Sequence, residues 1–267
     1  MASLAFSQGG HVVRYKPEAT VDVYDFTGAV SNQYAGGLDA PPLRVAQLTG
    51  VLKLKTEPRG EEWVVTGTCP ELSGNDGTKP LPEEQLKRCR LGKWIAPVSV
   101  KSAPGYTWND QPATPSVLNA VWWPLAWRPV GTDQPLKIGD SVEATFDLPV
   151  QAFLEDDPVG TAPIRIRYVF QGPSYLSQDP TWLFDIEAEE KIARDVKHPE
   201  REGLRLEGTV SIRGTLRIRR SDGRMEYGKF NMTADLRLAG EGLPFRTFSS
   251  ARTFVTAEYK RKTATER

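Results

Sequence analysis

Apolar and polar residues alternate without interruption over residues 203–220, GLRLEGTVSIRGTLRIRR. From Leu204 to Ile218 the even-numbered positions are apolar or glycine, and from Arg205 to Arg219 the odd-numbered positions are polar. Successive side chains of a β-strand point to opposite faces of its sheet, so this pattern predicts a strand with one apolar face. The segment is about three times as long as an ordinary strand.

A turn and a second alternating segment follow this strand. Asp222-Gly223 between two alternating segments is a strong signal for a β-hairpin. In the return strand, residues 224–239, the apolar positions change from odd to even numbers after Tyr227. Such a change requires one extra residue, and we expect this β-bulge at Gly228. The pattern therefore predicts a long, bent hairpin around an apolar interior.

Alternation, β-branched residues and flanking Gly, Pro or Asp predict strands along most of the chain. The candidate strands are residues 11–16, 20–31, 43–56, 61–69, 93–101, 119–128, 141–150, 164–171, 182–193, 203–220, 224–239 and 245–259. Pro82–Arg90 is the best candidate helix, with proline in its first turn, acids early and bases late. We predict an all-β protein: a large, strongly coiled antiparallel sheet of about a dozen strands, a half-barrel or barrel-like sandwich, with one short helix. Either packed side chains or an apolar ligand fill its interior.

A weaker copy of the long hairpin occurs near the N-terminus. Residues 49–55 (TGVLKLK) resemble residues 213–219 (RGTLRIR), and a turn and a return strand follow each segment. One interpretation is two related halves, residues 6–130 and 131–262. The other is a single continuous domain in which both hairpins share one sheet, and a chain of 267 residues is long enough for either arrangement.

Charge is balanced over the whole chain but unevenly distributed, with 34 Lys and Arg against 34 Asp and Glu. From Lys191 to the C-terminus there are 18 Lys and Arg against 10 Asp and Glu, a net charge of +8, and the remainder has −8. Either the two parts attract each other, or a basic face binds an acidic partner such as anionic lipid headgroups or an acidic glycan. Arg213, Arg217 and Arg219 form the candidate basic stripe. A DNA-binding domain is usually basic overall, so we expect no nucleic-acid partner.

The two cysteines, Cys69 and Cys89, flank a short, loop-like segment. We expect a disulfide between them, which would stabilise the fold by about 3 kcal/mol; the alternative is two unrelated buried thiols. A disulfide implies an oxidising compartment. Ser3-Leu4-Ala5 has the small-x-small pattern of a signal-peptidase site, so both features favour a secreted or periplasmic protein. The sequence contains no apolar stretch of about 18 residues that predicts a transmembrane helix.

Catalytic and cofactor motifs are missing from the sequence. We find neither a GxSxG nucleophile motif nor a glycine-rich phosphate loop, and the two histidines, His11 and His198, are far apart. We therefore expect a protein that is not an enzyme and binds no metal or cofactor. A hydrolase that uses paired carboxylates is the least favoured alternative.

Aromatic residues are concentrated in residues 106–127, a proline-rich segment. Rings in loops of this kind stack on sugars or form hot spots of protein interfaces, or else they fill the core beneath the loops. A carbohydrate-binding module is therefore an alternative function, with Trp108, Trp122, Trp123 and Trp127 as the stacking residues.

Gly139-Asp140-Ser141-Val142 follows this aromatic stretch and precedes a series of long alternating strands. This arrangement resembles secreted, β-rich envelope proteins of bacteria that have no assigned activity, and the resemblance implies no functional residues. Our first hypothesis is an exported, non-enzymatic β-protein of the bacterial cell envelope with a structural or interaction role, or with a bound lipid. Its partner would be an envelope protein or an apolar ligand, and peripheral contact with a membrane is compatible with this role. The candidate ligand contacts are Leu216, Ile218 and Phe230.

Overall fold

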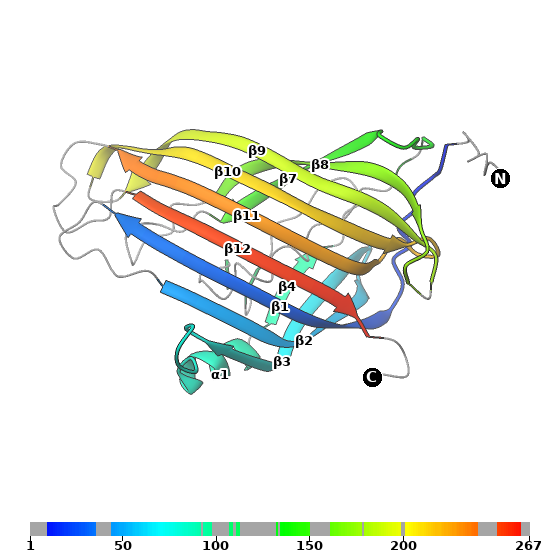
Figure 1. The fold of residues 1–267 in the computed structure, drawn as a ribbon, viewed down its shortest axis with the longest axis horizontal. Coiled ribbons are helices and arrows are strands. Elements are labelled where there is room, and N and C mark those ends of the chain that lie inside the picture. Colours follow the sequence, from blue (N-terminus) through cyan, green and yellow to red (C-terminus); the bar gives the residue numbers. More distant parts are fainter. Residues whose placement is uncertain are drawn as a thin grey trace, which may run out of the picture.

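The computed structural model describes residues 10–35, 44–91, 93–97, 107–108, 111–112, 132, 134–149, 161–177, 179–198, 201–239 and 250–262. These residues form one antiparallel sheet and one short helix (Figure 1). The prediction of an all-β protein with almost no helix is confirmed.

Nine strands of the sheet are nine residues long or longer. They are β1 (Thr20–Ala35), β2 (Arg44–Arg59), β3 (Glu62–Asn75), β7 (Ser141–Pro149), β8 (Thr161–Ser174), β9 (Thr181–His198), β10 (Arg201–Arg219), β11 (Met225–Ala239) and β12 (Ser250–Arg261). Three short strands extend one edge: β4 (Lys93–Pro97), β5 (Thr107–Trp108) and β6 (Gln111–Pro112). Helix α1 (Glu83–Leu91) has two glutamates in its first turn and confirms the predicted helix.

The strand order is β6-β5-β4-β3-β2-β1-β12-β11-β10-β9-β8-β7, with antiparallel neighbours throughout. The first and last strands of the chain, β1 and β12, lie side by side in the middle of the sheet (Figure 1). In their register Phe26 lies opposite Tyr259. The two predicted halves thus contribute adjoining parts of one sheet, and their origin by duplication stays a prediction.

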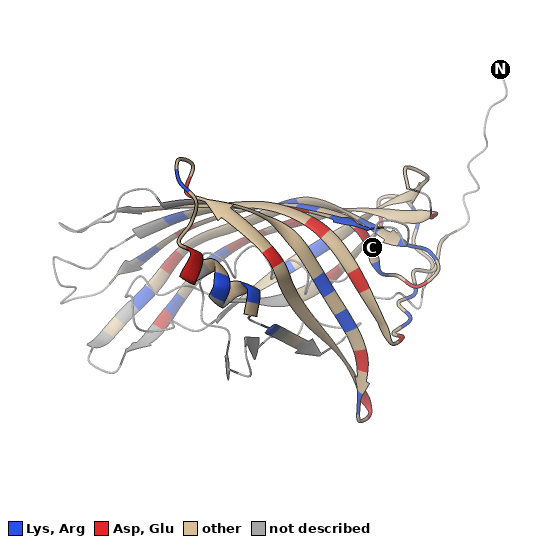
Figure 2. Ribbon diagram, turned by 90° about the horizontal axis from the view of Figure 1, so that it is seen from below, with Lys and Arg blue, Asp and Glu red and all other residues tan. Residues whose placement is uncertain are grey.

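The sheet is open, because β6 and β7 end the strand order and do not pair with each other. Figure 2 shows the long strands as one arched layer. The predicted strongly coiled, barrel-like sheet of about a dozen strands was therefore overstated. Hairpins on either side of the β1–β12 pair extend the sheet outward, whereas a barrel requires its two edges to meet. The candidate strand at residues 11–16 makes a single bridge, from His11 to Leu136, and residues 119–128 lie outside the described residues.

One face of the sheet carries the apolar core, as the alternation predicts. On β10 the even-numbered residues Leu206, Val210, Ile212, Leu216 and Ile218 are buried. They belong to one apolar cluster with members from all nine long strands. We call this side of the sheet the inner face. The described members of the cluster that lie outside the strands are Val13, Leu86, Cys89 and Leu136.

The opposite, outer face carries charged residues that pair across neighbouring strands. Arg167 lies 2.9 Å from Glu187, and Arg237 lies 2.6 Å from Glu207. Figure 2 shows residues of both signs spread along the strands. This face is therefore a polar, solvated surface, and part of the basic C-terminal region has carboxylate partners on it.

The phase change in β11 exists, but its extra residue is Glu226 and not Gly228. The register between β10 and β11 shifts after Arg217, and Glu226 is the residue of β11 without a partner on β10. At Gly228, an added Cβ would lie 2.7 Å from the ring of Phe230, so the glycine leaves room for that ring. The described residues contain no helix with the length and apolar character needed to cross a membrane.

Candidate functional site

The inner face is lined by aromatic and aliphatic side chains over β8 to β12. The ring centroids of Phe170 and Phe184 lie 5.3 Å apart, and those of Phe170 and Trp182 lie 5.6 Å apart. Phe230 and Tyr259 lie 6.2 Å apart with an edge-to-face geometry. These spacings are typical of favourable aromatic pairs. Together these side chains form a continuous apolar layer along the inner face, and all of them are buried.

The predicted ligand contacts Leu216, Ile218 and Phe230 all lie on this surface. Leu216 and Ile218 come from β10 and Phe230 from β11, and all three are buried within the same cluster. Parity alone was sufficient to find them. Their contact with a ligand stays a prediction.

His11, from the segment before β1, packs on the same aromatic group. Its ring centroid lies 4.8 Å from that of Trp182 and 5.8 Å from that of Phe170. This histidine therefore packs against rings. In the described ranges, no group of three or more His, Cys, Asp or Glu residues is placed to hold a metal ion.

Tyr168 and Asn32, both on the inner face, have buried polar atoms that form no hydrogen bond. Tyr168 of β8 is fully buried, and its hydroxyl has no hydrogen-bond partner. Burial raises the pKa of this hydroxyl well above its ordinary value, so the group is a neutral phenol. On β1, Asn32 is also buried, and its Oδ1 has no partner. Buried polar atoms without partners are rare in proteins and cost about 1–3 kcal/mol each.

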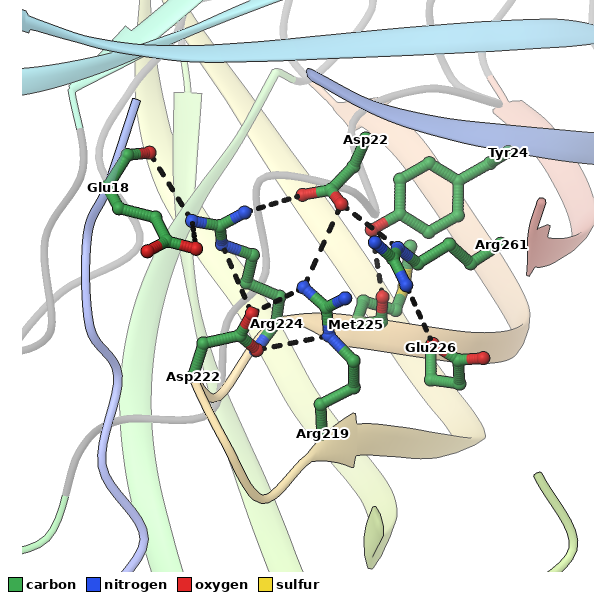
Figure 3. Close-up of polar contacts among 9 residues, drawn as sticks. All are labelled: Glu18, Asp22, Tyr24, Arg219, Asp222, Arg224, Met225, Glu226 and Arg261. Carbon is green, nitrogen blue, oxygen red and sulfur yellow. Dashed lines mark hydrogen bonds and ion pairs between the residues drawn. The ribbon is translucent and has the colours of Figure 1, made fainter. Parts of the chain in front are cut away.

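Charged side chains, most of them buried, cluster around Asp22 (Figure 3). Asp22, near the start of β1, has its carboxylate 2.9 Å from Nε of Arg261, 3.4 Å from Nη1 of Arg224 and 3.8 Å from Nη2 of Arg219. The side chains of Asp22 and Arg224 are each only 5% exposed. Asp222, in the β10–β11 turn, pairs with Arg219 and lies 3.7 Å from Nε of Arg224.

Two glutamates complete this ion cluster, which we define as Glu18, Asp22, Arg219, Asp222, Arg224, Glu226 and Arg261. Glu18 lies 3.1 Å from Arg224, and Glu226 lies 3.6 Å from Arg261. Three arginines thus face four carboxylates, which leaves no surplus positive charge to bind an anion. The cluster instead ties the segment before β1, the β10–β11 turn and the end of β12 together.

Sequence reasoning missed the ion cluster because its members are far apart along the chain. Asp22 and Arg261 are 239 residues apart. Among the described residues, each ion pair that joins β1 or the segment before it to another strand or turn links an acid of the acidic part to a base after Lys191. Lys262 with Asp25, at 3.0 Å on the outer face, follows the same rule. The described contacts therefore favour attraction between the two parts over a basic face for a partner.

The three arginines of the predicted basic stripe lie in different surroundings. Arg213 is exposed on the outer face. The guanidinium of Arg217 lies over the ring of Tyr227, 4.2 Å from its centroid. Arg219 is buried in the ion cluster, because the turn after β10 brings Asp222 against it. The three therefore do not form one exposed stripe.

Cys69 of β3 and Cys89 of α1 are both buried and are not bonded to each other, so the predicted disulfide is not formed. Helix α1 packs against β3 and inserts Leu86 and Cys89 into the apolar cluster, so packing holds the segment without a covalent bond. Burial, and to a lesser extent the proximity of Cys89, raises the pKa of the Cys69 thiol to about 12. Cys69 is therefore protonated and unreactive at neutral pH.

The aromatic residues proposed to stack on sugars fall largely outside the described part of the chain. Trp122, Trp123 and Trp127 lie outside the described residues. For Trp108 only the backbone is described, in β5, where it pairs with β4. The carbohydrate-binding role stays a prediction.

A hollow of about 670 Å³ lies beside β1, β2 and β3. Its polar lining comes from Asp25, Thr27, Thr49, Glu71, Ser73 and Arg90. Several of these groups already bind other side chains: Asp25 pairs with Lys262, and the hydroxyls of Thr49 and Ser73 lie 2.8 Å apart. The hollow is therefore a weaker candidate for a ligand site than the inner face.

Comparisons with known proteins give little further guidance. No family model matches the chain, and no curated protein matches it. Among solved structures, a chain from a study of lipid–protein interactions in lipovitellin aligns with 93% of this chain at a TM-score of 0.47 and 12% identity. The present chain spans about a quarter of that protein, 26% of its length. This likeness is too distant to assign a family or a function.

Proposed function

We propose that this protein is a non-enzymatic lipid-binding protein that holds an apolar ligand against the inner face of its sheet. The observation that carries the proposal is the extent of that face: one apolar cluster crosses all nine long strands. In a β-sandwich, a face of this kind packs against a second sheet. The described strands here form a single sheet, and the described residues outside the strands add only four members to the cluster.

Hydrocarbon would gain substantial free energy from contact with this face. Each methylene group that leaves water contributes about 0.8 kcal/mol, so a chain of about ten methylenes contributes about 8 kcal/mol before the costs of association. A surface of aromatic and branched aliphatic side chains provides this gain without selecting a particular head group. An acyl chain is the simplest ligand that uses so long an apolar surface.

Export to the bacterial cell envelope is part of the same proposal. It is supported by the small-x-small pattern at Ser3-Leu4-Ala5 and by the resemblance of the C-terminal half to secreted β-rich proteins. The partner would be an envelope lipid or an envelope protein, with peripheral contact to a membrane. The paired charges of the outer face are compatible with an aqueous compartment.

Native mass spectrometry of the gently purified full-length protein tests the proposal. We expect adducts with the masses of lipids, which disappear after extraction with organic solvent. The extracted protein should then bind a fluorescent acyl ester with a Kd in the micromolar range. Leu216→Ala, on the inner face, should weaken this binding more than Thr215→Ala, its neighbour on the opposite face. Absence of both adducts and ester binding would contradict lipid binding, and glycan binding that is lost in Trp108→Ala would favour the carbohydrate module.

A further inference from the structure

Tyr168 lies among apolar side chains of the inner face. Ile166 and Phe170 flank Tyr168 on β8, and both are buried. In the neighbouring strands, Tyr168 lies opposite Val142 of β7 and Ile186 of β9. A phenylalanine would fill the same space without a polar atom, so the hydroxyl is unexplained by packing.

Tyr24 shows what a satisfied tyrosine on the same face looks like. Its side chain is buried, and its hydroxyl donates a hydrogen bond of 2.8 Å to the carbonyl oxygen of Met225. The hydroxyl of Tyr168 has no such acceptor. The protein therefore bears the cost of a buried, unused donor on β8, and such groups in native proteins call for a specific explanation.

We propose that the Tyr168 hydroxyl anchors the ligand by donating a hydrogen bond to the carbonyl oxygen of an acyl ester whose hydrocarbon chain lies along the inner face. This inference rests on the lipid-binding function proposed above. The donor is suitable because burial raises its pKa and keeps the phenol neutral. The acceptor is a neutral carbonyl, because an ionised carboxylate in these apolar surroundings would lose its hydration without gaining a cation.

Two fluorescent probes of equal chain length test the anchor: a pyrene-labelled acyl methyl ester and a pyrene-labelled alkane. In Tyr168→Phe we expect the affinity for the ester to fall about five- to tenfold, the usual effect of one lost hydrogen bond. The affinity for the alkane should stay unchanged, and the melting temperature should stay the same or rise. Tyr24→Phe is the matched control: its melting temperature should fall, while the ratio of ester to alkane affinity should not change.

The outcomes separate the anchor from the lipid-binding function. If wild type binds both probes and Tyr168→Phe changes both affinities equally or neither, Tyr168 is not the anchor and lipid binding stands. If wild type binds neither probe, the lipid-binding function fails and the anchor fails with it. A selective loss of ester affinity in Tyr168→Phe alone supports the anchor.

Discussion

The β2–β3 and β10–β11 turns join strands of similar sequence but have very different surroundings. Both turns contain a glycine with positive φ, +66° at Gly60 and +74° at Gly223. A Cβ added to Gly60 would meet no atom within 4 Å. A Cβ added to Gly223 would lie 2.4 Å from the carbonyl oxygen of Arg14, in the segment before β1. One turn projects into solvent, and the other is covered by a distant part of the chain.

Charged residues at the two turns differ in the same way. Near the β2–β3 turn, Lys55 pairs with Glu57, and their side chains are 59% and 42% exposed. At the β10–β11 turn, Arg219, Asp222 and Arg224 join the buried ion cluster around Asp22. A similar alternating sequence thus produces a similar hairpin. The contribution of its turn to stability depends on which distant residues pack over it.

Replacement of Asp22 by alanine should have the largest effect on the β10–β11 hairpin, which we call the covered hairpin because the segment before β1 packs over its turn. This substitution would remove the one carboxylate that Arg219, Arg224 and Arg261 share, and loss of one partner of a buried ion pair costs about 3–5 kcal/mol. Urea unfolding measures this loss directly. Asp25→Ala is the matched control on the same strand: Asp25 is 60% exposed and pairs with Lys262, so its loss should cost about 1 kcal/mol or less. If both variants lose the same free energy of unfolding, the ion cluster is not the main stabilising contact of this hairpin.

Alanine at the two turn glycines compares the hairpins directly. Each substitution forces a side chain into the left-handed region at a cost of about 1–2 kcal/mol. At Gly223 the new methyl group must also displace the backbone of Arg14, so we expect about 2–4 kcal/mol in total. Gly60→Ala should show the conformational cost alone. Thermal unfolding of both variants measures the difference in stability. Equal destabilisation of the two variants would contradict a role for the segment before β1 in packing over the β10–β11 turn.

The long strands could be predicted from the sequence because period-two alternation is a local property. All nine long strands overlap a predicted one, and β10 follows its prediction within two residues. The open shape of the sheet could not be predicted in this way. It depends on β1 pairing with β12 in the middle of the sheet while β6 and β7 remain as its two edges, and alternation carries no information about which strands pair or whether the edges meet.

The candidate site was predictable only where it is apolar. Alternation predicts the burial of Leu216, Ile218 and Phe230. At the start of β1, however, it predicts the wrong residues to be buried. There Val21 is exposed and Asp22 is buried, the reverse of the usual preference, because the arginines that pair with Asp22 come from the distant C-terminal part. For Tyr168 the sequence carries one signal: a tyrosine stands at a position where alternation predicts a buried side chain.

Glu226 should make the covered hairpin sensitive to pH. Burial raises the pKa of its carboxyl group above the ordinary value of 4.5, and the nearby Arg261 and Arg219 offset this only partly. A raised pKa in the folded state favours the protonated form, so this stabilisation is present below about pH 4.5 and is lost as the pH rises through the folded-state pKa. Glu226→Gln cannot ionise. Relative to wild type, its free energy of unfolding should therefore increase from pH 4 to pH 7. A constant difference across this range would contradict the prediction.

Loss of the exposed ion pair beside the β2–β3 turn should have the smallest effect. Glu57→Gln removes the partner of Lys55, and both side chains remain free to bind water, so we expect a change of about 0.5 kcal/mol or less that vanishes in concentrated salt. Asp222→Asn is the corresponding change in the covered turn. There the carboxylate accepts hydrogen bonds from Nε of Arg219 at 3.1 Å and from the backbone N–H of Arg224 at 3.0 Å. Asp222→Asn should therefore lower the free energy of unfolding several times more than Glu57→Gln does. This decrease should not depend on salt, because buried charges are poorly screened. Urea unfolding measures the loss of free energy of unfolding in both variants. If the two losses are equal, burial of the charges does not distinguish the two hairpins. The β10–β11 turn would then be stabilised by its backbone contacts with the segment before β1.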